Sequence, residues 1–218
     1  MPLTDAEFRI QLLAADDAGL VALVNDEMLD RQPTCFDADP SVYDQLRAHL
    51  AKALKTTPDS VYLVGSASLG YSTAPDGFPR KFHDLSDLDF AVVSPSLFDE
   101  SWMHLLGWGH VHKPVFPPED EKWFVQRQRE IFWGWFPQYL PRFTGVNRPE
   151  LLRGHAGIRL QMFETFQSLG KNFPGTQVES HPNHGRLYRS RDHLVRYHVD
   201  GLRRLQERLI EGDSNNGI

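Results

Sequence analysis

Two aspartates, Asp87 and Asp89, stand two positions apart in the stretch Ser86-Asp-Leu-Asp-Phe-Ala-Val-Val93. We expect this stretch to be a β-strand, so both carboxylates point to one face, because alternate side chains of a strand share a face. Two carboxylates so close repel each other, and a divalent cation removes the repulsion. Mg²⁺ prefers such hard oxygen ligands, with phosphate oxygens and water completing its shell. The pair is therefore a candidate site for Mg²⁺, or for Mn²⁺ in its place.

A second candidate for chemistry lies upstream, where the apolar run Val61-Tyr-Leu-Val64 passes directly into Gly65 and Ser66. The β-rich run predicts a buried strand, and the glycine predicts its end. A strand that turns at Gly-Ser into a helix directs backbone NH groups and a hydroxyl at one point, which suits a phosphate. Ser68 is a further candidate contact to the nucleotide on the same turn.

Two other motifs compete for this glycine-rich turn. Gly65 and Gly70 have the spacing of a P-loop, but Tyr71-Ser72 stands where Lys-Ser or Lys-Thr is required, so a P-loop is excluded. Ser66-x-Ser68-x-Gly70 is similar to a nucleophile elbow whose first glycine is replaced. A serine hydrolase with Ser68 as its nucleophile is therefore kept as an alternative.

The Val-Gly-Ser of residues 64–66, followed by Ser-Asp-Leu-Asp-Phe on the next expected strand, resembles the nucleotidyltransferase superfamily with the fold of DNA polymerase β. The resemblance covers residues 61–93. It implies that Gly65 and Ser66 hold the phosphates of a nucleoside triphosphate and that Asp87 and Asp89 are the ligands of two Mg²⁺ ions. The implied activity is Mg²⁺-dependent transfer of a nucleoside monophosphate to a hydroxyl acceptor, with no covalent enzyme intermediate.

The chain departs from this family pattern in two ways. Twenty residues separate Ser66 from Asp87, more than is usual, and the extra length falls in the loop 73–82. Active members also bring a third carboxylate from a later strand. We assign this role to Glu179, because Thr176-Gln-Val-Glu-Ser180 is compatible with a short strand. The alternatives lie in segments expected to be helical: Asp99, Glu100 and Glu164.

Arginines are concentrated near the C-terminus, between Arg186 and Arg208. Guanidinium groups near the cleft bind phosphates well, and we select Arg189 as the candidate nucleotide contact from this cluster. Arg80 and Lys81, on the long loop, are placed to close over a triphosphate. The net charge of −6 provides no overall basic surface, so binding of nucleic acid is possible but is not implied.

Elements that position these residues are predicted from apolar periodicity and turn residues. Thr4-x-x-Glu7 is a capping box that opens a helical N-terminal region. The tryptophans between Trp102 and Trp135 are expected in the core rather than on a binding platform.

The expected strands are 61–64 and 86–93, and the expected helices after the first are 41–54, 97–106, 123–139, 158–169 and 192–209. These elements predict an α/β (α+β) fold, a small mixed sheet flanked by N- and C-terminal helices. It forms one domain over 1–218, with its core at about 41–100 and a helical part at about 101–212.

Composition is that of an ordinary globular protein, with 40% hydrophobic and 24% charged residues among 218. No apolar stretch approaches about 18 residues, and the N-terminus lacks the features of a secretory signal, so we expect a cytoplasmic protein without a membrane span.

The acceptor is left open among nucleotides, nucleic-acid ends, proteins and small molecules, with anti-phage defence or a toxin–antitoxin pair as possible bacterial settings. A catalytically silent nucleotide-binding partner or sensor is the alternative function.

Overall fold

The computed structural model describes residues 2–112, 118–137 and 149–215, and it has an α+β fold, as predicted. The described strands form one mixed sheet in the order β1-β2-β4-β3. β1 pairs with β2 antiparallel, β2 with β4 parallel, and β3 with β4 antiparallel. The strands are β1 (Val61–Val64), β2 (Leu88–Val93), β3 (Trp135–Pro137) and β4 (Asn183–Tyr188).

The helices surround this sheet, and several match the predicted ranges closely. The capping box at Thr4 is formed, since its side chain accepts from Glu7 NH and Glu7 reaches back to Thr4 NH. The α-helices are α1 (Asp5–Ala14), α2 (Asp17–Leu23), α3 (Pro40–Ala53), α4 (Ser66–Leu69), α5 (Pro95–His112), α6 (Pro118–Phe132), α7 (Pro149–Asn172), α8 (Gln177–Ser180) and α9 (Arg191–Asn215). A π-helix follows α2 (Val24–Leu29), and short 3₁₀ helices are formed at Thr34–Phe36 and Pro58–Ser60.

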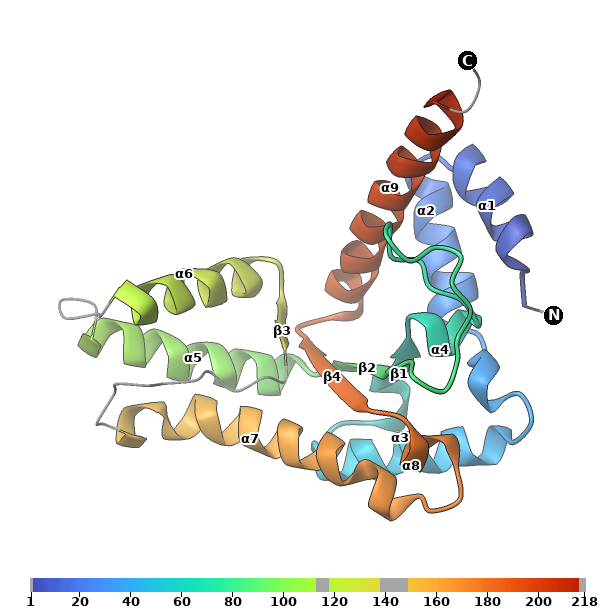
Figure 1. Ribbon diagram of the computed structural model, residues 1–218. Coiled ribbons are helices and arrows are strands. Elements are labelled where there is room, and N and C mark those ends of the chain that lie inside the picture. Colours follow the sequence, from blue (N-terminus) through green and yellow to red (C-terminus); the bar gives the residue numbers. More distant parts are fainter. Residues whose placement is uncertain (1, 113–117, 138–148, 216–218) are drawn as a thin grey trace.

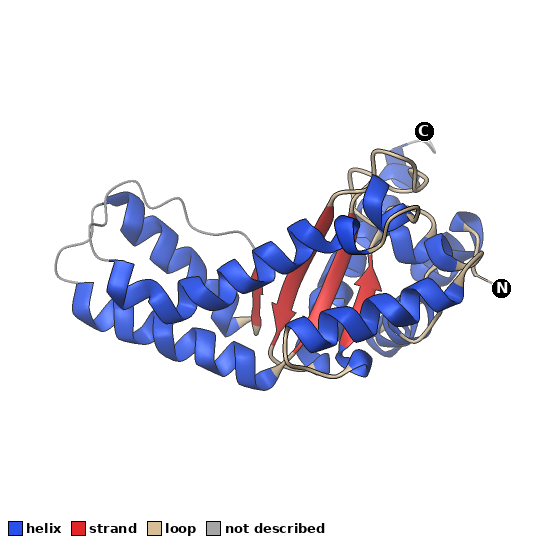
Figure 2. Cartoon of the chain, turned by 90° about the horizontal axis from the view of Figure 1, so that it is seen from below, coloured by secondary structure: helices blue, strands red, loops and turns tan. Residues whose placement is uncertain are grey.

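The core lies in two layers, one on each face of the sheet. Leu63 and Phe90 belong to the layer built with α3, α5 and α7, whereas Val64, Ala91 and Tyr188 belong to the layer built with α1, α2 and α9. Figure 1 shows α1, α2 and α9 together on one side of the strands, and Figure 2 shows the strands between helices. The alternation of a strand explains the division, because neighbouring side chains point to opposite faces.

Two predicted elements differ from the structure, and one strand was not predicted. In the segment 176–180, residues 177–180 form the one-turn helix α8, capped by the Thr176 side chain, and not a strand. The predicted helix 123–139 ends at Phe132 because Gly134 takes a positive φ of 73°, and β3 follows; residues 138 and 139 lie outside the described part. β4 was not predicted at all. The buried positions of β4 include Asn183 and Gly185, which are not apolar side chains, so the sequence does not show the alternation typical of a strand.

No helix in residues 2–112, 118–137 and 149–215 is long and apolar enough to cross a membrane.

Candidate functional site

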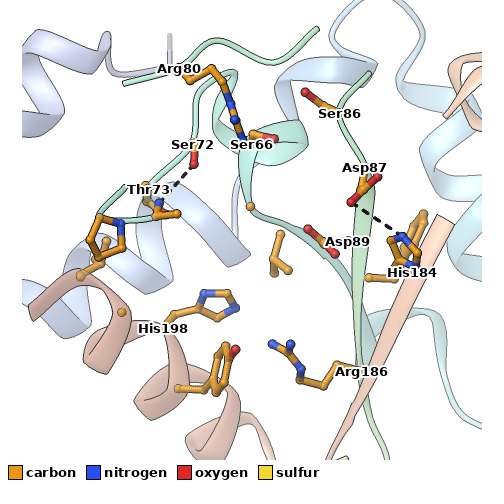
Figure 3. A pocket seen from close by; sticks show the side chains of 18 of the residues that line it. Ser66, Ser72, Thr73, Arg80, Ser86, Asp87, Asp89, His184, Arg186 and His198 are labelled. Carbon is orange, nitrogen blue, oxygen red and sulfur yellow. Dashed lines mark hydrogen bonds and ion pairs between the residues drawn. The ribbon is translucent and has the colours of Figure 1, made fainter. Parts of the chain in front are cut away.

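A cavity of about 570 Å³ opens beside the sheet on the face that α9 covers (Figure 3). Residues from β1, β2, β4, α9 and the long loop line it. It therefore collects residues that are more than one hundred positions apart in the chain. Those that could do chemistry at its centre are Gly65, Ser66, Asp87, Asp89, His184 and Arg186.

The Gly-Ser turn lies directly against the aspartates, as the sequence predicted. Val64, the last residue of β1, is the antiparallel partner of Asp89 in β2. Gly65 has φ +72°, a backbone conformation that favours glycine, so the turn itself requires this residue. A Cβ at this position would lie 3.4 Å from the Asp89 Oδ2, an ordinary contact distance, which shows how near the carboxylate lies to the turn. Because α4 has only four residues, its dipole is small, and the turn offers mainly its backbone and the Ser66 hydroxyl.

Asp87 and Asp89 both line the cavity, while Leu88 and Phe90 between and after them are buried in the opposite layer. Asp89 is the second residue of β2, and Asp87 comes immediately before the strand. Figure 3 shows both side chains along this edge of the cavity. The alternation that the sequence predicted is thus observed.

The electrostatic surroundings of Asp89 oppose its charge. Desolvation by the surrounding protein raises the pKa of Asp89 above its usual value. Arg186 and His184 counteract this rise, and Asp87 reinforces it. The side chain nevertheless remains open to solvent on the cavity side. A carboxylate that is reached by solvent but poorly solvated gains from a cation at this place.

The donor set suits one hard divalent cation that also binds phosphate. Mg²⁺ commonly takes one or two carboxylates and completes its six ligands with phosphate oxygens and water. Among the described residues, no group of three His, Cys, Asp or Glu side chains is placed to hold a metal ion. Asp87 and Asp89 thus bring two carboxylates to the cavity, and no third side chain of this kind in the described part of the chain completes a metal-binding group with them.

Glu179 is not at the site, contrary to the prediction. It lies in α8, exposed to solvent, and its Oε2 accepts a hydrogen bond of 2.7 Å from Gly175 NH. The alternatives also lie elsewhere, because none of them lines the cavity. Asp99 and Glu100 belong to α5, and Glu164 belongs to α7.

His184 occupies the place where a third carboxylate was expected. β4 runs parallel to β2, and His184 is the partner of Asp89 in the register. The His184 Nε2 lies 3.7 Å from the Asp87 Oδ2. A later strand therefore lies beside Asp89, and it carries an imidazole and not a carboxylate at this position. A sequence signal existed in the alternation of His184 and Arg186, but we read Arg186 only as part of the arginine cluster and assigned His184 no role in the site.

Arg186, two residues further along β4, brings a fixed positive charge to the same cavity. Its guanidinium lies between two rings, 4.9 Å from the centroid of Trp135 and 4.5 Å from that of Tyr197. Its Nη1 also donates to the Tyr188 hydroxyl at 3.4 Å. Burial by itself would lower the pKa of Arg186, but Tyr188, Tyr197 and Asp89 raise it above its usual value. The group therefore stays charged, and Figure 3 shows it extending into the cavity.

Arg189 does not contact the cavity, so its selection as the nucleotide contact was wrong. It follows the end of β4, and its Nε lies 3.1 Å from the Asp99 Oδ1. Its guanidinium also lies over the ring of Trp102, 5.7 Å from the centroid. Arg186 is the arginine of this cluster that the strand directs into the cavity.

Ser68 has a structural role in the fold. It is 1% exposed, and its Oγ donates to the Met28 carbonyl oxygen at 3.1 Å. It does not line the cavity, so it is neither a phosphate contact nor an accessible nucleophile. The alternative of a serine hydrolase built on Ser68 is therefore dropped.

The two basic residues of the long loop point to different places. Arg80 lines the cavity, together with Ser72 and Thr73. Lys81 instead pairs with Asp5 of α1, 2.6 Å from its Oδ1. The loop thus supplies one guanidinium to the rim of the cavity and uses its neighbour to anchor itself.

His198 of α9 also projects into the cavity, and its buried Nε2 has no hydrogen-bond partner among the described residues. Burial, aided by Arg186, lowers its pKa from 6.5 to about 4. The folded protein therefore holds His198 neutral, and acid must charge it in place. The neutral His198 ring makes its full contribution to the free energy of unfolding above pH 6.5, the pKa in the unfolded chain. This contribution is lost as the pH falls toward 4.

We expect His198→Phe to remove this part of the acid sensitivity. Between pH 7 and pH 4.5, the wild type should lose roughly 2 to 3 kcal/mol of unfolding free energy more than the variant. Urea unfolding of both proteins at the two pH values measures the difference. Equal losses in the two proteins would show that His198 does not titrate with a lowered pKa.

Comparisons of the chain with protein-family models, with curated proteins and with solved structures found no match.

Proposed function

We propose that this protein is a Mg²⁺-dependent nucleotidyltransferase, which moves a nucleoside monophosphate from a nucleoside triphosphate to a hydroxyl acceptor. One observation carries the proposal. The Gly65–Ser66 turn and the carboxylates of Asp87 and Asp89, separated by a long loop in the sequence, line one cavity, and Val64, just before the turn, pairs with Asp89 in the sheet. A phosphate cradle beside a pair of hard oxygen ligands suits a metal–triphosphate complex.

Each residue has a role in this proposal. Asp87 and Asp89 would hold the cation, which when bound neutralises phosphate charge and favours ionisation of the attacking hydroxyl. The glycine at position 65 lets the backbone approach the phosphates closely. Arg186, already oriented by Trp135 and Tyr197, offers a charge-assisted donor to a phosphate oxygen.

His184 favours a second candidate, a catalytically silent nucleotide-binding module. Beside Asp89, an imidazole stands where the resemblance implies a carboxylate. An imidazole brings no negative charge to a second cation, so nucleotide binding without transfer is consistent with this geometry. Such a module would act as a sensor or as the partner of another protein.

Thermal unfolding with each of the four nucleoside triphosphates, with and without Mg²⁺, tests the binding that both candidates require. At a ligand concentration one hundred times Kd, binding adds about 2.7 kcal/mol and raises Tm by about 5 °C or more. No Mg²⁺-dependent rise with any triphosphate would contradict both candidates.

A pyrophosphate assay then separates the two. Incubation of the protein with radiolabelled triphosphates, Mg²⁺ and cell extract should release pyrophosphate and label an acceptor. Stabilisation by a triphosphate without release of pyrophosphate or labelling favours the silent module.

A further inference from the structure

A second pocket, of about 540 Å³, lies beside the cavity of the candidate site. The corner between α6 and β3 forms one wall, through Phe132, Trp133 and Trp135. The exposed side of α9 forms the other wall. Tyr197 and Arg204 of α9 line both pockets, so the two are contiguous.

Part of the aromatic wall of this pocket is open to solvent, and the exposure of Trp133 is contrary to the expectation that the tryptophans belong to the core. Phe132 is 78% exposed and Trp133 is 58% exposed. Their rings meet edge to face, with centroids 5.3 Å apart. Large rings exposed together cost hydration free energy, and such a surface commonly marks a binding site for an apolar or aromatic group.

The corner that carries these rings is tightly held. Gly134 has φ +73°, and a Cβ at this residue would lie 2.0 Å from the His193 ring of α9. The Gly134 carbonyl also accepts a hydrogen bond of 2.9 Å from Arg189 NH. The backbone of this corner is therefore held in place, so stacking of a planar ring on Trp133 requires little further ordering of the chain.

Charges around the second pocket are balanced. Arg196 pairs with Asp192 at 2.9 Å, and the Arg204 Nε donates to the Asp200 carbonyl oxygen at 3.1 Å. Two arginines and two aspartates thus line it, whereas the first cavity is lined by three arginines, Arg80, Arg186 and Arg204, and by two aspartates, Asp87 and Asp89. The balance favours a planar and uncharged group rather than a chain of phosphates, and a nucleobase has this character.

We propose that the second pocket binds the nucleobase of an acceptor nucleoside. The inference rests on the proposed function and names its acceptor class. The acceptor hydroxyl would reach the first cavity past Tyr197. There its oxygen bonds to the α-phosphorus, the α–β bridging bond breaks, pyrophosphate leaves with the bonding electrons, and the hydroxyl proton passes to water. The first cavity is of the size of a complete ligand site, so the donor does not need the second one.

Calorimetric titration of two ligands into three variants tests this inference. The ligands are a non-hydrolysable triphosphate analogue with Mg²⁺, and each of the uncharged nucleosides adenosine, guanosine, cytidine and uridine. The variants are Trp133→Ala, Asp87→Asn and, as a control, Ile10→Ala, an exposed apolar residue of α1 outside both pockets.

We expect Trp133→Ala to weaken binding of at least one nucleoside about tenfold or more, as loss of a stacking ring does, and to leave analogue binding unchanged. Asp87→Asn should weaken binding of the triphosphate analogue and leave nucleoside binding unchanged. Ile10→Ala should change the binding of neither ligand. A nucleoside that binds the wild type and Trp133→Ala equally, or no binding of any nucleoside, would overturn the inference.

Two other outcomes separate the inference from the function beneath it. If the nucleosides compete with the analogue, and Trp133→Ala weakens both, then the second pocket holds the donor base and the acceptor assignment is wrong. If Asp87→Asn binds the analogue as the wild type does, the proposed function fails, whatever the nucleosides do.

Discussion

We expect Asp87→Asn and Asp89→Asn each to lower Mg²⁺-dependent pyrophosphate release at least about a hundredfold. A cation held by these carboxylates supplies several kcal/mol of charge stabilisation in the transition state, and each amide removes one negative ligand. The fold should tolerate both changes, because each side chain faces the cavity and not the core. Initial rates with a saturating triphosphate and the acceptor measure the effect.

Stability should separate a loss of chemistry from a loss of structure. The raised pKa of Asp89 means that its charged form is disfavoured in the folded state, so the neutral amide should keep or slightly raise Tm. Asp44→Asn, at an exposed position of α3 in the opposite layer, is the matched control and should retain full activity. Full activity in both cavity variants would remove the metal assignment.

Gly185→Ala should have the largest effect on stability. Gly185 lies in β4 between His184 and Arg186, and an added Cβ would lie 1.9 Å from the Phe166 ring. Phe166 is fully buried and stacks on Phe90 at 5.6 Å, so its ring has no space to retreat. We expect a loss of about 3 kcal/mol, the upper part of the range for overpacking, and a fall in Tm of about 6 to 12 °C.

A second glycine supplies the control for this prediction. Gly107, in α5, has open space where a Cβ would stand. Gly107→Ala should therefore raise the stability slightly, by up to about 1 kcal/mol, because alanine favours the helix. Thermal unfolding of both variants measures the contrast. A Gly185→Ala protein as stable as the wild type would show that β4 and α7 do not pack this closely.

The centre of the candidate site was predictable because its signals are local. A short apolar run, a glycine at its end and two alternating aspartates each constrain the backbone within a few residues. The pairing of β1 with β2 then places Val64 beside Asp89. The long loop between them did not disturb this pairing, since it leaves and rejoins the sheet at the ends of the two strands.

The rest of the site depends on contacts that no local pattern reports. The signal of β4 is weak because Gly185 is required by the Phe166 ring and carries no apolar side chain of its own. Residues 176–180 are helical because the Thr176 side chain accepts from Val178 NH and begins a helical turn. His198 reaches the cavity only because α9 packs over this face of the sheet.

The assignment of Arg189 failed for a similar reason. Along a strand, alternate residues face opposite sides, so the direction of each arginine in residues 186–189 depends on where the strand ends. Arg186 faces the cavity within β4, whereas Arg189 lies beyond the strand and pairs with Asp99 of α5. Recognition of the strand would have selected Arg186.

Water-proton relaxation with Mn²⁺ and a non-hydrolysable triphosphate tests most directly whether the turn and the aspartates form one metal–nucleotide site. Addition of wild-type protein to the Mn²⁺–triphosphate complex should enhance relaxation, because the bound ion tumbles with the protein. The double variant Asp87→Asn, Asp89→Asn should give little enhancement at the same concentrations. An equal enhancement with both proteins, or none with the wild type, would contradict the site described here.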